Sequence, residues 1–269
     1  MEEVIPKIIH YCWFGGNPLP ENLKQYIATW SEYCPDYEIK EWNEGAFDIN
    51  SNEFTKTAYE HKKWAYVSDY VRAYALYHEG GIYLDTDVEL KANLDQFLEH
   101  EAFTGFESKG SPFTALWAAI PKHSLTEKVL SYYEGRVYTS TQETNTASVS
   151  RTLIDEFGIE PNNNTLQIGS DGKHSIYIYP AEYFCLDLLP NFATHHFEGS
   201  WVKDKQPFKK YFHAKYHLTK AIEISGENFQ LLNRLAQDLS FKGLMKIIIY
   251  KIYHLLPERI KNLRSKIKR

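Results

Sequence analysis

The chain has 269 residues, which is enough for one large domain with a full hydrophobic core. Its net charge of −5 divides into −13 for residues 1–240 and +8 for residues 241–269, because the final segment holds nine of the 30 Lys and Arg but one of the 35 Asp and Glu. The acidic main body argues against general nucleic-acid binding, and three cysteines without paired spacing argue against a disulfide framework or a zinc ribbon.

The first predicted element is a strand in IPKIIHYCWFGG, residues 5–16, which closes at two glycines. The residues before it are acidic, so we expect no signal peptide. The sequence contains no run of about 18 apolar residues, so we expect no membrane-spanning helix. Together with the unpaired cysteines, these features predict a cytoplasmic protein. A helix is expected in PENLKQYIATWSEYCP, residues 20–35, between two prolines.

The next elements continue the alternation of strand and helix. YEIKEWN at 37–43 predicts a second strand, a long helix follows from about Phe54 to His78, and HEGGIYLDTDVEL at 78–90 predicts a third strand. This order indicates an α/β fold with a mostly parallel sheet flanked by helices. The later elements are short strands within 100–180, helices near 125–136 and 147–157, a turn-rich excursion at 162–175 and a strand in IYIYP at 176–180.

The predicted helix before the third strand carries apolar residues on both faces, so we expect it to pack on two sides. On this helix Asp69 and Arg72 lie three residues apart, where side chains can touch. An exposed ion pair worth roughly a few tenths of a kcal/mol is the simpler interpretation. Because the helix leads directly into a pair of acids, a functional pair is the alternative.

Two carboxylates, Asp85 and Asp87, end the third predicted strand. In an extended segment, side chains alternate, so both acids and Tyr83 are expected on one face. Ligands of open α/β sheets bind at the carboxyl ends of the strands. Paired carboxylates with open positions suit Mg²⁺ or Mn²⁺ held together with substrate phosphates.

The composite SDYVRAYALYHEGGIYLDTDVEL, residues 68–90, resembles the core of glycosyltransferase family 32, the enzymes with a sugar-binding region containing a DXD motif. This family includes yeast Golgi mannosyltransferases and many bacterial capsule enzymes, and the clostridial glucosylating toxins are more distant relatives. IPKIIHYCWFGG and HHFEGSW, residues 195–201, are similar to the family's opening and late elements. These landmarks span residues 5–201, whereas 104–180 matches no motif of the family.

The resemblance implies a GT-A fold and a retaining, metal-dependent transfer of a hexose from a nucleotide-sugar, with a UDP-sugar favoured, to an oligosaccharide or lipid-linked saccharide in bacterial surface-polysaccharide synthesis. It implies that Trp13 stacks on the base of the donor. Asp69 and Arg72 would hold the donor sugar and its diphosphate. Asp85 would contact the ribose and a metal-bound water, and Asp87 would bind Mn²⁺ or Mg²⁺ directly. The predicted catalytic residues are Asp69, Arg72, Asp85 and Asp87.

The resemblance also assigns residues to the edges of the donor site. Tyr83 belongs to the donor site beside the two acids. His195 or His196 would approach the metal, with His195 favoured, and Ser200 and Trp201 would touch the phosphates. The simpler alternatives are that Trp13 is an ordinary core tryptophan and that His195 and His196 are surface histidines.

The chemistry leaves other functions open. We expect no protein nucleophile, because both acids of the motif would be engaged with the metal, so the acceptor would attack on the side of the leaving group. A phosphatase with a D-x-D nucleophile is one alternative, although Glu89 stands where that motif has Thr or Val. A non-catalytic module that binds nucleotide-sugars or partner proteins is the other.

The last segment, 241–269, is apolar in its first half and basic in its second. We predict a GT-A catalytic domain at 1–240 and a helical, basic C-terminal tail at 241–269. The tail would bind an anionic membrane surface and place the enzyme on the inner face of the cell membrane. A packed C-terminal helix with a frayed basic end is the simpler alternative.

Overall fold

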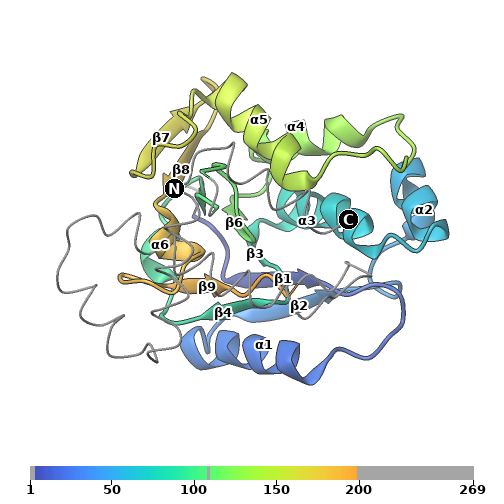
Figure 1. Cartoon of the computed structure of the whole chain (residues 1–269), viewed down its shortest axis with the longest axis horizontal. Coiled ribbons are helices and arrows are strands. Elements are labelled where there is room, and N and C mark those ends of the chain that lie inside the picture. The colour runs from blue at the N-terminus through green and yellow to red at the C-terminus, as the bar shows by residue number, and fades with distance from the viewer. Residues whose placement is uncertain (1–3, 108–109, 199–269) are drawn as a thin grey trace, which may run out of the picture. The chain divides into compact units, whose positions relative to one another are not determined.

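A computed structural model describes residues 4–107 and 110–198 of the chain (Figure 1). The chain divides into two units, Met1–Lys205 and Gln206–Arg269, and all described residues belong to the first. The predicted domain boundary at residue 240 and the predicted tail at 241–269 lie outside the described residues and stay predictions. Within the described ranges, no helix is both long and apolar enough to cross a membrane.

A mixed seven-stranded sheet forms the centre of the domain (Figure 1). Five of these strands run in one direction, and β6 and β7 run in the other. The predicted α/β class with a mostly parallel sheet is therefore confirmed. In spatial order the strands are β2 (Glu38–Trp42), β1 (Ile8–Cys12), β3 (Gly81–Leu84), β6 (Leu116–Ala119), β5 (Ala102–Gly105), β8 (Ser175–Tyr179) and β7 (Gln167–Ser170).

Helices cover both faces of this sheet. On one face, Tyr11 of β1 contacts Trp30 of α1, and on the other, the guanidinium of Arg72 from α3 lies over the ring of Tyr83 from β3. In Figure 1, α4 and α5 lie beyond α3, and α1 lies on the opposite side of the domain. The helices are α1 (Glu21–Tyr33), α2 (Glu53–Glu60), α3 (Trp64–Glu79), α4 (Ser124–Tyr133), α5 (Asn145–Phe157) and α6 (Ala181–Phe184), with 3₁₀ turns at Ile49–Ser51 and Asp95–Phe97.

The predicted long helix from Phe54 to His78 is wrong in one respect, because the structure divides it into α2 and α3. Lys62 adopts a left-handed backbone with φ of 56°. Its N–H donates to the carbonyl of Tyr59, and the N–H of Lys63 donates to that of Ala58, which is the Schellman pattern of a helix end. Glycine usually occupies this position, so the sequence carried no clear stop signal.

The third predicted strand is also shorter than expected. β3 ends at Leu84, and the N–H of Val88 donates to the carbonyl of Asp85, so the D-x-D segment is a turn and not a continuous strand. After this turn β4 (Val88–Leu90) leaves the main sheet and pairs antiparallel with β9 (Ala193–His195). The predicted continuous strand is therefore wrong at the two acids, since a turn and not strand alternation sets their directions, although Tyr83 still contacts Asp85.

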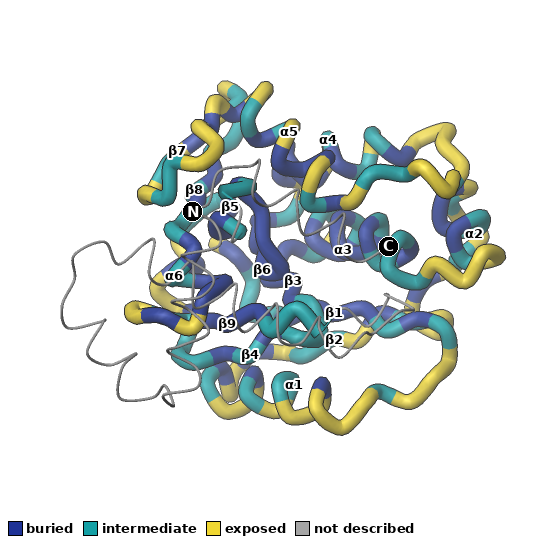
Figure 2. Tube along the Cα trace, viewed as in Figure 1, coloured by how far each residue is buried: buried dark blue, intermediate teal, exposed yellow. Residues whose placement is uncertain are grey.

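A hydrophobic core cluster lies between the sheet and the layer formed by α1, β4 and β9, and the central strands are strongly buried (Figure 2). Trp30 of α1 is fully buried, and its indole N–H donates to the carbonyl of Val88 at 2.9 Å. This bond satisfies a backbone acceptor directly after the D-x-D turn, so α1 fixes where the turn ends. A strand also occurs where the sequence predicted a turn-rich excursion, because β7 pairs with β8 as a hairpin.

The buried side chain of His123 makes the stability of the fold depend on pH. Its Nδ1 accepts the N–H of Leu125 at the start of α4, and its Nε2 lies 3.0 Å from the carbonyl of Ser175. Burial lowers the pKa of His123 from 6.5 to about 4, and His174 adds to the shift. The unfolded chain therefore takes up a proton between pH 6.5 and 4 that the folded chain excludes.

We expect the free energy of unfolding to fall as the pH drops through this window, by up to about 3 kcal/mol from this residue. Urea denaturation at pH 7 and pH 4.5 measures the change. His123→Asn keeps a capping acceptor but does not titrate, so its loss between the two pH values should be smaller than that of the wild type. Equal losses in both proteins would contradict the assignment.

Candidate active site

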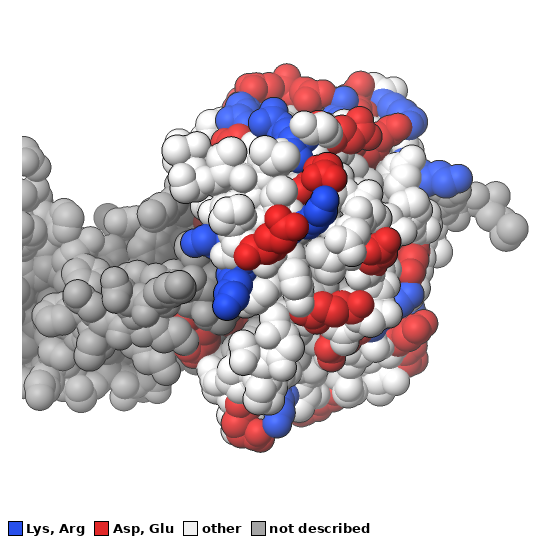
Figure 3. All heavy atoms as spheres, turned by 90° about the vertical axis from the view of Figure 1, so that its right-hand side faces the viewer, with Lys and Arg blue, Asp and Glu red and all other residues white. Residues whose placement is uncertain are grey.

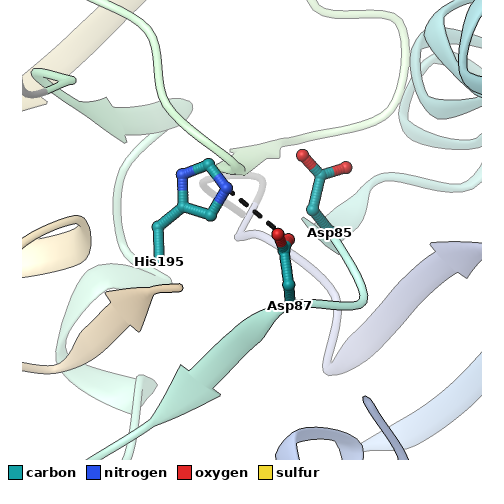
Figure 4. A group of neighbouring side chains, drawn as sticks. All are labelled: Asp85, Asp87 and His195. Atoms are coloured by element: carbon teal, nitrogen blue, oxygen red, sulfur yellow. Dashed lines mark ion pairs between the residues drawn. The ribbon is translucent and has the colours of Figure 1, made fainter. Parts of the chain in front are cut away.

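The two acids of the turn meet a histidine from the far end of the described chain (Figure 4). Asp85 follows β3, Asp87 precedes β4, and His195 ends β9, where the antiparallel pairing sets it opposite Val88. One ligand atom from each of the three residues lies within 4.8 Å of the others. Two carboxylates and an imidazole are an oxygen and nitrogen donor set that suits a divalent transition ion such as Mn²⁺, so the residues fit the metal that the sequence predicted.

Asp87 is the most constrained member of this cluster. His195 Nε2 lies 3.5 Å from its Oδ1, and the backbone N–H of Glu198 donates to its Oδ2 at 2.8 Å. Burial by itself would raise the pKa of Asp87, but His195 and this N–H hold it below the usual value. The pKa of His195 is raised for the reciprocal reason: burial opposes its charge, and Asp87 outweighs that effect. The carboxylate is therefore ionised, as a metal ligand must be.

Arg72 connects the cluster to α3. One of its nitrogens lies 3.2 Å from Asp69 and 3.1 Å from Asp85, and the side chains of Arg72 and Asp69 are 10% and 12% exposed. The interpretation of Asp69 and Arg72 as an exposed pair is therefore wrong. Tyr83 donates its hydroxyl hydrogen to Asp85 at 3.1 Å, while its ring lies 4.6 Å from the guanidinium. Charge and aromatic contacts thus orient Asp85 from two sides.

Asp69 is a weaker acid than an ordinary carboxyl group. Burial raises its pKa to about 7, and Asp85 adds to the rise although Arg72 opposes it. The pKa of Arg72 is itself raised, since its negative neighbours outweigh the burial that would lower it. Asp69 therefore exchanges its proton near neutral pH and can accept or donate a hydrogen bond there.

The two candidate histidines differ in their surroundings. His195 points to Asp87, whereas His196 Nε2 lies 2.8 Å from Glu89 Oε2 and its ring stacks on Tyr26, with centroids 4.2 Å apart and planes at 8°. The structure thus brings His195 into the acidic cluster and directs the ring of His196 to Glu89. Ser200 and Trp201, predicted to touch the phosphates, lie outside the described residues.

Trp13 lies one residue beyond β1, at the edge of the core cluster, and is partly exposed. Its backbone N–H donates to Trp42 O at 2.9 Å, and its indole N–H donates to Asn17 O at 2.6 Å. The next turn needs glycine, because Gly15 has φ of 99° and a Cβ there would lie 2.6 Å from the Trp64 indole. These contacts fix the position of Trp13 without burying it completely.

Sequence reasoning missed three supports of the site. Glu89 stands two residues after Asp87, a spacing that could have linked it to His196. Tyr26 on α1 and the backbone N–H of Glu198 reach the site through tertiary contacts, for which the sequence carried no signal. Glu89 and Tyr26 thus hold His196, and the N–H of Glu198 holds Asp87 from a segment far from the motif.

The buried bridge predicts a large loss of stability for Arg72→Met. Without the guanidinium, Asp69 and Asp85 remain close together and lose their shared cation, so the free energy of unfolding should fall by about 3–5 kcal/mol. Urea denaturation at pH 7 measures it. Lys24→Met is the matched control, because Lys24 forms an exposed i,i+3 pair with Glu21 and should change stability by at most about 0.5 kcal/mol. Similar small losses in both variants would refute the bridge.

Comparison with known proteins agrees with this cluster. Residues 20–104, which include the whole D-x-D turn, match a family described as glycosyltransferase sugar-binding region containing DXD motif. The chain carries a DXD glycosyltransferase region. The predicted resemblance is confirmed by this match, which covers residues 20–104.

Individual relatives match different shares of this chain. It is 36% identical over 107 residues to inositol phosphoceramide mannosyltransferase 3 of Schizosaccharomyces pombe, a match that covers 37% of this chain and 29% of that protein. It is 26% identical over 229 residues to the uncharacterized glycosyltransferase L373 of Acanthamoeba polyphaga mimivirus, a match that covers 79% of this chain and 90% of that protein. Among solved structures, the PaToxG glycosyltransferase aligns with a TM-score of 0.44 and 20% identity, over 57% of this chain and 70% of that one.

Proposed function

We propose that this chain is a GT-A-type glycosyltransferase that transfers a hexose from a nucleotide-sugar to a saccharide acceptor, with a divalent metal and with retention at the anomeric carbon. The observation that carries the proposal is the cluster of Asp85, Asp87 and His195 beside the Arg72 bridge, within a DXD glycosyltransferase region. A divalent ion held by these three residues supplies positive charge where a departing diphosphate gains negative charge.

The protein's own residues have distinct tasks in this proposal. Arg72 contributes a fixed positive charge to the diphosphate and keeps Asp85 in place. Asp69, with a pKa near neutrality, binds hydroxyl groups of the donor sugar. Trp13 offers an aromatic face to the base, and one stacked base is worth about 1–3 kcal/mol in single-strand binding proteins.

The carboxylates of the cluster are engaged, which supports attack by the acceptor without a protein nucleophile. Asp85 is held by Arg72 and Tyr83, Asp87 by His195 and a backbone N–H. The same engagement disfavours the phosphatase alternative, which requires a carboxylate free to attack phosphorus. Trapping a covalent glycosyl-enzyme would refute acceptor attack.

The donor and acceptor follow from resemblance and relatives. We favour a UDP-hexose, with GDP-mannose as the competing donor because a matched relative is named a mannosyltransferase. For the acceptor we propose a lipid-linked or oligosaccharide intermediate of bacterial surface polysaccharide. That relative is also named for inositol phosphoceramide, and the chain spans 29% of its length. A cytoplasmic enzyme held at the membrane by residues 241–269 would meet a lipid-linked acceptor there. Flotation with anionic liposomes tests this anchor by comparing the full chain with a chain that ends at Ser240. Equal flotation of the two proteins would refute the anchor.

A donor panel tests the reaction class. The full chain is incubated with Mn²⁺ and each of UDP-glucose, UDP-galactose, UDP-N-acetylglucosamine and GDP-mannose, and the free nucleoside diphosphate is measured. We expect slow hydrolysis of one donor in preference to the others, with an α-configured sugar released from a retaining enzyme. Binding of a nucleotide-sugar without any turnover would favour the non-catalytic module instead.

A further inference from the structure

Asn145, the first residue of α5, has a buried polar atom without a partner. The residue is 4% exposed, and its Nδ2 donates to the hydroxyl oxygen of Tyr133 at 3.3 Å. Its side-chain carbonyl Oδ1 is buried without a hydrogen-bond partner among the described residues. A buried acceptor left unsatisfied is costly, and in a native protein such an atom indicates a strained site or a missing ligand.

A line of polar side chains leads from Asn145 to the acidic cluster. Tyr133 of α4 lies close enough to Asp69 and Arg72 that both affect its ionisation, after the larger effect of burial. Arg72 in turn bridges Asp69 and Asp85. Asn145 at the start of α5 is therefore linked through Tyr133 to the surroundings of Asp69 and Arg72, although it is separated from the D-x-D turn by more than 50 residues of sequence.

The backbone before α5 is held next to the same part of α3. Tyr66, one turn before Asp69, lies with its hydroxyl 3.4 Å from the carbonyl of Gln142 and donates to it. Thr144 caps the helix by accepting the N–H of Ala147. The helix start is thus tied to α3 and to α4, and the direction of Asn145 is set by packing on both.

Helix α5, which begins at Asn145, and strand β1, which precedes Trp13, lie on different sides of α3. In the sheet, β1 lies on one side of β3, while β6 lies on the other, and α5 packs towards the β7 end. Figure 1 shows α5 on the side of α3 away from β1. In the proposed function Asp69 binds the sugar of the donor, and Tyr133 links Asn145 to this side of the site.

We propose that Asn145 is a specificity-determining contact to the transferred sugar, whose hydroxyl hydrogen is accepted by the unpartnered Oδ1. A diphosphate carries acceptors only and cannot satisfy a carbonyl, whereas sugar hydroxyls are donors. Asn145 and Asp69 would then read neighbouring hydroxyls of the hexose from two helices. This inference rests on the proposed function and adds a residue outside every motif of the sequence.

The test compares binding with and without the sugar. The full chain and Asn145→Ala are titrated calorimetrically, with Mn²⁺ present, against UDP-glucose, UDP-galactose, UDP-N-acetylglucosamine and GDP-mannose, and against UDP and GDP alone. For the nucleotide-sugar that the wild type binds best, the variant should lose about tenfold in affinity, the usual effect of one hydrogen bond, and less than about twofold for the matching nucleotide. Asn145→Leu, similar in shape and without polar atoms, should lose the same contact.

Ser150→Ala is the matched control, because Ser150 is also a buried α5 residue with an unpartnered hydroxyl but lies on another face of the helix. It should bind nucleotide and nucleotide-sugar like the wild type. Equal losses for both ligand types in the Asn145 variants, or no loss for either, would overturn the inference and leave the reaction class intact. If the wild type binds no nucleotide-sugar, the proposed function fails, and this contact fails with it.

Discussion

Asp87→Asn is expected to lower the rate of donor hydrolysis by about 10²–10³-fold, the scale of one lost electrostatic contact to a developing charge. Asp87 lies in the turn between β3 and β4, where His195 and the N–H of Glu198 hold its two oxygens. Asparagine keeps the shape and one acceptor oxygen, so the fold should persist while the negative charge is lost. Release of nucleoside diphosphate at saturating Mn²⁺ and donor measures the rate, and thermal denaturation checks the fold.

The control for this variant is a carboxylate away from the cluster. Asp95 accepts hydrogen bonds from Lys7 and Tyr37, and Asp95→Asn makes the same chemical change there. We expect the hydrolysis rate of Asp95→Asn to stay within about twofold of the wild type. Equal rates in the wild type and Asp87→Asn would count against the glycosyltransferase mechanism.

His195→Ala is expected to raise the Mn²⁺ concentration that half-activates hydrolysis by about 10–100-fold, whereas His196→Ala should raise it by less than about threefold. The difference follows from the geometry, because His195 points to Asp87 and His196 is held by Glu89 and Tyr26. Hydrolysis measured over a series of Mn²⁺ concentrations at fixed donor gives both midpoints.

The pair of variants also distinguishes metal binding from simple packing. His196→Ala removes a stacked ring and an ion pair, so it should lower the melting temperature while the Mn²⁺ midpoint stays near that of the wild type. A larger shift of the midpoint in His196→Ala than in His195→Ala would reverse the assignment of the two histidines.

The face of the domain shown in Figure 3 gives no comparable signal of function. On the face in Figure 3, acidic and basic side chains are interspersed and not gathered by sign. The functional prediction therefore depends on the chemistry at the end of β3, and the charge pattern of this face adds nothing to it.

Much of the fold could be predicted because its elements have local causes. The apolar run at residues 8–12 predicted β1, and the flanking prolines predicted α1. Predictions failed where a residue adopted a conformation against its type, as Lys62 does at the end of α2. They failed again at residues 85–88, where antiparallel pairing with β9 draws the chain out of the main sheet.

The sequence by itself determined the composite motif, the resemblance to DXD glycosyltransferases and most of the strands and helices, because these depend on residue types at short spacing. Tertiary structure alone decided which groups surround the motif. The bridge from Arg72 to Asp85, the contact of His195 with Asp87 and the pairing of Asn145 with Tyr133 all depend on contacts between different elements of the fold. The strand register and helix packing that create these contacts have no local sequence signal, so only the folded chain reveals them.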